Sequence, residues 1–197
     1  MKDNLLFQHN PMVIKIPSPQ KILIIYNPIS SAGNTEAMAC KLETELMFHG
    51  KTVEVRTSEK KMKGYMRISD DIAASDLVVV VGGDGTIRKL LDIINKTATP
   101  IYAIPGGNES LFARFYEMSA SAEDLLQSIT AGTCLQQFYG LISGKGIQGE
   151  KPFFNMASMG LDSLTVKNIG KRKGPLNDSI YVWHGLKALC ALHHPTV

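Results

Sequence analysis

Cysteine is scarce in this chain of 197 residues, which contains three. Cys40, Cys134 and Cys190 are odd in number and far apart, and no two of them form a C-x-x-C pair. The sequence therefore predicts neither a disulfide framework nor a cysteine zinc site, and it favours a reducing cytosol. The five histidines lack i,i+4 pairing with an acid, so no histidine metal site is predicted either.

Long apolar runs are also missing, because no stretch reaches the roughly 20 residues that cross a bilayer. Residues 1–20 interrupt their apolar positions with Asp3, His9 and three prolines, unlike the h-region of a signal peptide. A cytoplasmic protein is expected, with any membrane contact peripheral at the inner surface. The net charge is only +3 and no basic stripe with interleaved aromatics occurs, so nucleic acid is not an expected partner.

The most informative segment covers residues 78–86 and reads Val-Val-Val-Val-Gly-Gly-Asp-Gly-Thr. Four β-branched residues without alternation predict a central parallel strand that is buried on both faces. The glycines that follow allow several backbone N–H groups to converge on an anion. A helix is expected from about Thr86, with its positive end at the same place and apolar residues at Ile87, Leu90, Leu91 and Ile94. This arrangement predicts a phosphate site.

Asp84 is the one acid in this turn, and it would repel a bare phosphate. Its position is understandable if a Mg²⁺ ion or a ribose hydroxyl lies between the two groups. The alternative is a tight β-to-α turn without a ligand, which glycines also serve. A dinucleotide fingerprint fits poorly, because no G-x-G-x-x-G occurs and the second predicted strand, residues 53–56, ends in a base.

Strand and helix patterns alternate from Lys21 to Gly132, after an irregular extension expected over residues 1–20. Strands are predicted at residues 22–26, 53–56, 77–81 and 101–104, and one helix follows each strand: one that ends before Gly50, a weaker one over residues 62–74, one from about Thr86 and one between Ser121 and Gly132. This alternation predicts an α/β fold with a doubly wound parallel sheet, whose ligand crevice lies beyond the carboxyl ends of the strands. The loops after Tyr26, Val81 and Ile104 all leave such ends and can converge on one ligand.

The pattern changes at about Thr133. Residues 136–143 and 152–157 are predicted to be two antiparallel strands, joined by the glycine-rich loop 144–149. Residues 177–194 predict a helix that is apolar nearly all round, and such a helix needs covering on several sides.

Four short segments agree with one protein family in order and in spacing: Asn27–Gly33, Gly82–Thr86, Pro105–Arg114 and Phe153–Asp162. They resemble the Asn-Pro-x-Ser-Gly, Gly-Gly-Asp-Gly-Thr, Pro-x-Gly-Thr-x-Asn-x-x-Ala-Arg and Phe-x-Asn-x-x-Ser-x-Gly-x-Asp segments of the diacylglycerol kinase catalytic domain family. That family includes bacterial lipid kinases and sphingosine kinases, with the NAD kinases as more distant relatives. Since all four agree in register, the chain is identified as a member.

The resemblance implies an enzyme that binds ATP and Mg²⁺ and transfers the γ-phosphoryl group to a lipid hydroxyl at a membrane surface. It implies that residues 21–132 are a nucleotide-binding α/β catalytic domain and that residues 133–197 begin a β-rich second domain. Because relatives continue further, we expect an incomplete second domain in a truncated or split product.

Asp84 is the candidate catalytic residue, for handling phosphate and Mg²⁺. The residues that the resemblance places at the nucleotide are Asn27, Ser31, Thr57, Gly82, Gly83, Asp84, Gly85, Thr86, Gly107 and Asn108. Two of them have structural alternatives. Asn27 could serve as a turn-forming Asn-Pro, and Thr57 could cap the segment after its strand.

Two departures from the family pattern bear on activity. Arg88 and Lys89 stand where the family usually has Asn and then an acid; these cations oppose the helix dipole but could bind phosphate. The family's general base, a Glu in an Asp-Gly-Glu segment, has no counterpart, because Glu150 precedes the fourth motif. Such a base contributes about 10²- to 10⁴-fold in rate.

Three hypotheses remain open. The first is a lipid kinase acting on a hydroxyl such as that of diacylglycerol or a sphingoid base. The second is a truncated or degenerate nucleotide-binding module of the same family without catalysis. An NAD kinase relation is weaker, because residues 153–162 resemble the lipid kinases.

Overall fold

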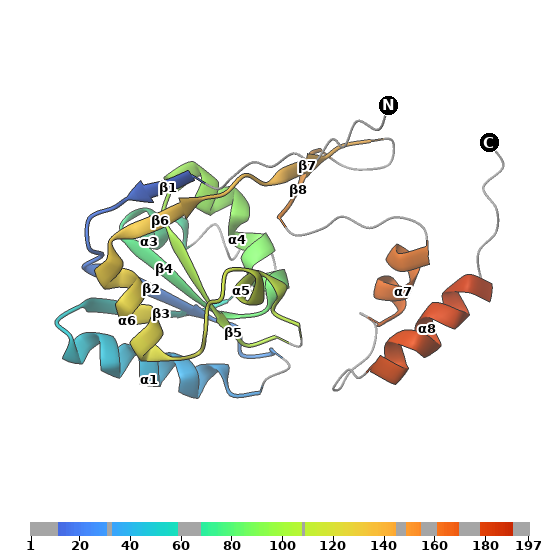
Figure 1. The fold of residues 1–197 in the computed structure, drawn as a ribbon, viewed down its shortest axis with the longest axis horizontal. Helices are drawn as coiled ribbons and strands as arrows, with labels where there is room; N and C mark the ends of the chain where they lie inside the picture. Colours follow the sequence, from blue (N-terminus) through green and yellow to red (C-terminus); the bar gives the residue numbers. More distant parts are fainter. Residues whose placement is uncertain are drawn as a thin grey trace, which may run out of the picture.

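The structure is a computed structural model and describes residues 12–30, 33–58, 68–107, 109–144, 149–154, 161–169 and 178–190. Its centre is a parallel sheet with the strand order β3-β2-β4-β5 (Figure 1). The strands are β2 (Lys21–Tyr26), β3 (Thr52–Thr57), β4 (Leu77–Gly82) and β5 (Ile101–Pro105). The parallel sheet predicted from the alternation of strands and helices is confirmed.

Helices cover both faces of this sheet, which makes it doubly wound (Figure 1). One face packs against α1 (Thr35–Phe48) and α6 (Ala122–Ala131), and the other against α3 (Ser69–Ala73), α4 (Asp84–Thr97) and α5 (Leu111–Phe115). In β4, Val78 and Val80 belong to one core cluster, while Val79 and Val81 belong to the other. All four are fully buried, and each contributes about 1.5–3 kcal/mol of hydrophobic free energy.

The first strand corrects one prediction. β1 (Met12–Lys15) pairs antiparallel with β6 (Thr133–Gln136), so the expectation of an irregular segment over residues 1–20 is wrong for this stretch. Met12 and Val13 stay largely exposed, at 61% and 62%. β1 is held mainly by main-chain pairing with a distant segment. Its side chains are not buried in a regular pattern, so its sequence does not indicate a strand. Residues 1–11 lie outside the described part, and the division at residue 132 stays a prediction.

The antiparallel hairpin predicted after residue 133 is confirmed in its centre. β7 (Gly140–Ile142) pairs with β8 (Lys151–Phe153), and both strands are shorter than predicted. The residues between Gln136 and Gly140 interrupt the first predicted strand. Residues 145–148 and 155–157 lie outside the described part of the chain. Of the helix predicted over residues 62–74, residues 62–67 also lie outside it, and α3 is the described part.

Two more helices follow, α7 (Leu161–Ile169) and α8 (Asp178–Cys190), and they pack against each other. α8 confirms the helix predicted over residues 177–194, whereas α7 was not predicted. Ala188 is fully buried, but Val182, Trp183, Leu186 and Leu189 on the same helix are more than half exposed. Among the helices that the structure describes, none combines the length and apolar character needed to cross a membrane.

A carboxylate holds the start of the sheet. The Asp76 Oδ2 atom accepts hydrogen bonds from the backbone N–H groups of Lys21 at 2.8 Å and of Gln20 at 2.9 Å. These two hydrogen bonds hold the pKa of Asp76 below its ordinary value, and the one from Lys21 has the larger effect. The anion therefore fastens the residues that enter β2 to the residues that enter β4.

We expect part of the acid sensitivity of the fold to come from Asp76. Folding lowers the pKa of Asp76, so the ionised group adds to the free energy of unfolding above its unfolded pKa of about 3.9. This added stability is lost as the pH falls through the pKa of the folded state. Asp76→Asn should lower the free energy of unfolding at neutral pH by less than about 1 kcal/mol, because the group is exposed. The variant should then lose less stability on acidification than the parent.

Urea unfolding at about pH 7 and at about pH 3 measures this difference. Asp92→Asn, which changes an exposed acid on α4, is the matched control and should keep the parent's pH dependence. Identical acid dependence in the parent and in Asp76→Asn would contradict the assignment.

Candidate functional site

Three loops meet at the carboxyl ends of the parallel strands. The Asn27 N–H donates to the Val81 carbonyl at 3.0 Å, which joins the loop after β2 to β4. The Ser30 hydroxyl donates to the Gly106 carbonyl, and the Gly106 N–H donates to the Gly82 carbonyl at 3.0 Å. The loops after β2, β4 and β5 are thus in direct contact, as expected from their shared edge of the sheet.

Glycines allow two of these loops to pack backbone against backbone. A Cβ atom on Gly107 would lie 2.7 Å from the Gly83 Cα atom, and a Cβ atom on Gly83 would lie 3.1 Å from the Gly107 Cα atom. A Cβ atom on Gly106 would lie 3.1 Å from the Gly82 Cα atom. Packing between the loops therefore explains these glycines without a ligand.

Gly85 is different. A Cβ atom at this position would meet nothing within 4 Å among the described atoms. Gly85 lies in the first turn of α4, where alanine would favour the helix by up to about 1 kcal/mol. Neither packing against described atoms nor helix propensity explains a glycine here, and its effect is to leave the surface of this turn open.

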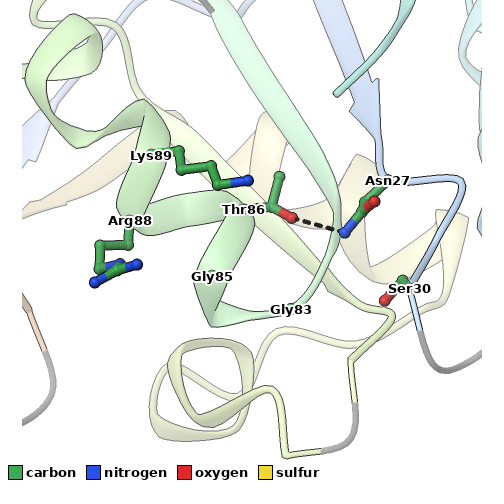
Figure 2. Close-up of a pocket in the computed structure, with 7 residues that line it drawn as sticks. All are labelled: Asn27, Ser30, Gly83, Gly85, Thr86, Arg88 and Lys89. Carbon is green, nitrogen blue, oxygen red and sulfur yellow. Dashed lines mark hydrogen bonds between the residues drawn. The ribbon is translucent and has the colours of Figure 1, made fainter. Parts of the chain in front are cut away.

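The open surface is one wall of a pocket of about 200 Å³ (Figure 2). The described residues that line it are Asn27, Ser30, Gly83, Gly85, Thr86, Arg88 and Lys89. Thr86 is buried, with its Oγ1 atom 3.3 Å from the Asn27 Nδ2 atom that donates to it. The structure therefore brings together Asn27, Gly83, Gly85 and Thr86 of the predicted nucleotide residues.

Asn27 forms a turn, and its side-chain amide also faces the pocket. Its Oδ1 atom accepts from the Ile29 N–H at 3.2 Å, and its carbonyl accepts from the Thr35 hydroxyl at 2.7 Å, which builds the turn. Its Nδ2 atom remains on the side of Thr86 and the pocket (Figure 2). The turn thus fixes an amide donor at the pocket wall.

Two cations line the same pocket. Gly85, Arg88 and Lys89 are spaced i, i+3 and i+4, so they share one face of α4. Helical side chains lean toward the N-terminus, which brings Arg88 and Lys89 back toward the turn that Gly85 leaves open. Figure 2 shows Lys89 extending toward Thr86 and Asn27, while Arg88 projects on the side away from Asn27. No carboxylate is among the described lining residues, so the charged side chains of this lining are both cationic.

Asp84 has partners outside the pocket lining. Its Oδ2 atom accepts from the Leu111 N–H and its Oδ1 atom from the Phe112 N–H, both at 2.9 Å. Asp84 therefore caps the N-terminus of α5 and ties it to α4. It is not one of the described residues that line the pocket. Its predicted role in handling phosphate and Mg²⁺ stays a prediction.

The other predicted residues lie as follows. Gly82 and Gly107 hold the loops together, as described above. Thr57 is exposed at the end of the edge strand β3 and is not among the described lining residues. Ser31 and Asn108 lie outside the described part of the chain. Ser30 lines the pocket but was not predicted, although the Ser30-Ser31 pair in the first motif carried a signal for it.

A comparison of this chain with protein families settles its membership. Residues 21–139 match the diacylglycerol kinase catalytic domain, which is more than half of the chain. The chain belongs to the diacylglycerol kinase catalytic domain family. The matched range contains the four strands of the parallel sheet and every described residue that lines the pocket.

Individual relatives of this kinase family are distant. A protein of Streptococcus pneumoniae serotype 4 (strain ATCC BAA-334 / TIGR4) named "Putative lipid kinase" is 25% identical over 139 residues, which are 64% of this chain and 47% of that protein. The chain thus spans about half the length of this curated relative.

Solved structures are more distant still. The crystal structure of a diacylglycerol kinase from Bacillus anthracis str. Sterne is 21% identical, with a TM-score of 0.48, and the match covers 56% of this chain and 40% of that one. A second structure from the same organism has a TM-score of 0.46 at 21% identity, covering 56% and 42%. The fold assignment therefore rests on the parallel sheet of this chain itself.

The kinase family implies ATP and a divalent cation, and the pocket fits them unequally. Amide, hydroxyl and cationic donors beside a helix N-terminus suit a phosphate chain. Mg²⁺ is usually held by one or two carboxylates together with phosphates and water. The described lining offers no carboxylate, and within the described ranges no group of three or more His, Cys, Asp or Glu residues could hold a metal.

Proposed function

We propose that this chain is the nucleotide-binding part of an ATP-dependent lipid kinase, which transfers the γ-phosphoryl group of ATP to a lipid hydroxyl. The observation that carries the proposal is the pocket at the start of α4, where Gly85 leaves an open surface between amide, hydroxyl and cationic donors (Figure 2). Phosphoryl transfer depends on positioning and charge neutralisation rather than on covalent chemistry with the protein. Such a pocket supplies both.

Each lining group has a part in the proposed complex. The backbone N–H groups of Asp84 and Gly85, in the first turn of α4, would donate to a phosphate, because Gly85 places no side chain on this part of the pocket wall. Asn27 and Ser30 would bind from the loop after β2. Arg88 and Lys89 would bind from the second turn of α4. A Mg²⁺ ion would arrive as the counter-ion of the nucleotide rather than be held by the described pocket residues.

A second candidate function is a nucleotide-binding module that transfers nothing. It is favoured by the composition of the pocket, because the described lining residues include no carboxylate or histidine that could take a proton from an acceptor hydroxyl. Incubation with labelled ATP and vesicles containing diacylglycerol or a sphingoid base separates the two. Labelled lipid supports the kinase, whereas ATP binding without labelled lipid supports the module.

Gly85→Ala tests the position of the nucleotide. The methyl group should raise the free energy of unfolding by up to about 1 kcal/mol, because it meets no described atom and favours the helix. The same methyl group should keep phosphate from the amides of the first turn and weaken ATP binding by about 10- to 100-fold. Urea unfolding and isothermal titration calorimetry with ATP measure the two effects.

Gly185→Ala is the matched control, since it places a methyl group in the open on α8, away from the pocket. It should leave ATP binding unchanged. If Gly85→Ala binds ATP as tightly as the parent, the phosphates do not lie on this turn. If the folded parent gives no heat of binding with ATP, with or without MgCl₂, the proposed function is wrong.

A further inference from the structure

The charges that line the pocket bear on whether ATP binding at this site needs a divalent cation. On the basis of the proposed nucleotide site, we propose that Arg88 and Lys89 neutralise the phosphates in place of a metal held by the protein, so that the pocket binds ATP without a divalent cation. Both side chains line the pocket from the i+3 and i+4 positions above Gly85. This placement supplies the neutralising charge from the protein.

The acids closest to the pocket in the chain are not among the described residues that line it. Both carboxylate oxygens of Asp84 accept backbone N–H groups at 2.9 Å, from Leu111 and from Phe112. Turning this carboxylate toward a metal would leave two amides of α5 without their acceptor. Asp92 lies about one turn beyond Arg88 and Lys89 on the same face of α4, and it is not among the described lining residues.

Glu36, in the first turn of α1, is hydrogen-bonded at 3.3 Å to the Tyr26 hydroxyl and is not among the described lining residues. Since a protein-held Mg²⁺ is usually bound through one or two carboxylates, the described pocket lacks the usual ligand.

Electrostatics favours the metal-free nucleotide in this pocket. Arg88 and Lys89 lie just beyond the positive N-terminal turn of α4, so positive charge gathers on one side of the pocket. Free ATP carries more negative charge than its Mg²⁺ complex and gains more from these cations. A Mg²⁺ ion in the same pocket would be repelled by both of them. The pocket thus favours metal-free ATP over the Mg²⁺ complex of ATP.

The first measurement compares ATP binding in excess EDTA and in excess MgCl₂ by calorimetry, at constant ionic strength. We expect ATP to bind in EDTA at least as tightly as in MgCl₂, because the cations that line the pocket gain more from the metal-free nucleotide. Binding that requires MgCl₂ would overturn this inference and leave the proposed nucleotide site standing. Absence of binding under both conditions, with folded protein, would overturn the proposed function itself.

The second measurement uses the Arg88→Gln, Lys89→Gln double variant. It should bind ATP about 100-fold more weakly than the parent in EDTA, as expected when two charge-assisted contacts are lost. MgCl₂ should restore part of this affinity, because the metal then replaces the missing charge. The parent should show no such rescue.

Lys96→Gln, which removes a cation from the last turn of the same helix, is the control and should behave as the parent in both buffers. If the double variant binds ATP in EDTA as tightly as Lys96→Gln does, then Arg88 and Lys89 do not neutralise the phosphates. If the double variant binds ATP equally weakly in EDTA and in MgCl₂, the proposal that Arg88 and Lys89 replace a metal ion is also refuted.

Discussion

Gly107→Ala should lower the free energy of unfolding by about 2–3 kcal/mol, at the upper end of the usual cost of overpacking. The new Cβ atom would lie 2.7 Å from the Gly83 Cα atom, and it would also lie 3.4 Å from the Gly83 backbone nitrogen. Because the opposing atoms are backbone, no side-chain rotation can relieve the contact. The loops after β4 and β5 would have to separate, which strains the bond from Gly106 to Gly82.

Urea unfolding measures this loss, and Gly85→Ala provides the matched control. Both substitutions add one methyl group beside the same pocket, but the methyl group at Gly85 meets no described atom within 4 Å. The two variants should therefore change stability in opposite directions. A Gly107→Ala variant as stable as the parent would show that the two loops do not pack backbone against backbone.

Asp84→Ala should cost about 2–4 kcal/mol, because it removes the acceptor of two backbone N–H groups at the start of α5. Leu111 and Phe112 would be left without their acceptor, and Phe112 belongs to the core cluster on this face of the sheet. The amides of both residues should exchange with solvent faster than in the parent. Unfolding in urea and hydrogen exchange followed by NMR measure the two effects.

Asp92→Ala is the control for Asp84→Ala, since it removes an acid from an exposed position on the same helix. It should change stability by less than about 0.5 kcal/mol. If Asp84 instead acts only as a ligand for phosphate-bound Mg²⁺, its removal should alter ATP binding in MgCl₂ and leave the stability of the unliganded protein unchanged. That outcome would contradict the capping role.

Local sequence patterns were sufficient for the framework of this fold. The unbroken run from Val78 to Val81 predicts a strand buried on both faces, and each residue is fully buried. Ser121 and Gly132 bound α6 as predicted: the Ser121 hydroxyl accepts from the Asp124 N–H at 3.3 Å, and Gly132 ends the helix in the left-handed conformation. These signals lie within a few residues of the structure they determine, so one sequence is enough to detect them.

The contacts between distant segments could not be predicted in the same way. β1 pairs with β6, which follows the last helix of the α/β domain in the sequence, and neither strand has a pattern that identifies the other. Asp84 was expected to face a ligand, but its carboxylate meets α5, a five-residue helix that was not predicted. Short helices and edge strands depend on tertiary contacts more than on their own propensity.

The sequence by itself determined the parallel α/β sheet, the strand ends where the loops gather, and the kinship with lipid kinases. Only the tertiary structure decided which glycines pack against another loop and which leaves its surface open. Gly107 lies against Gly83, whereas Gly85 faces open space. It also decided that Arg88 and Lys89 line the pocket while Asp84 does not. The physical reason is that periodicity and turn chemistry act over a few residues, whereas contact and local charge arise when separate segments meet.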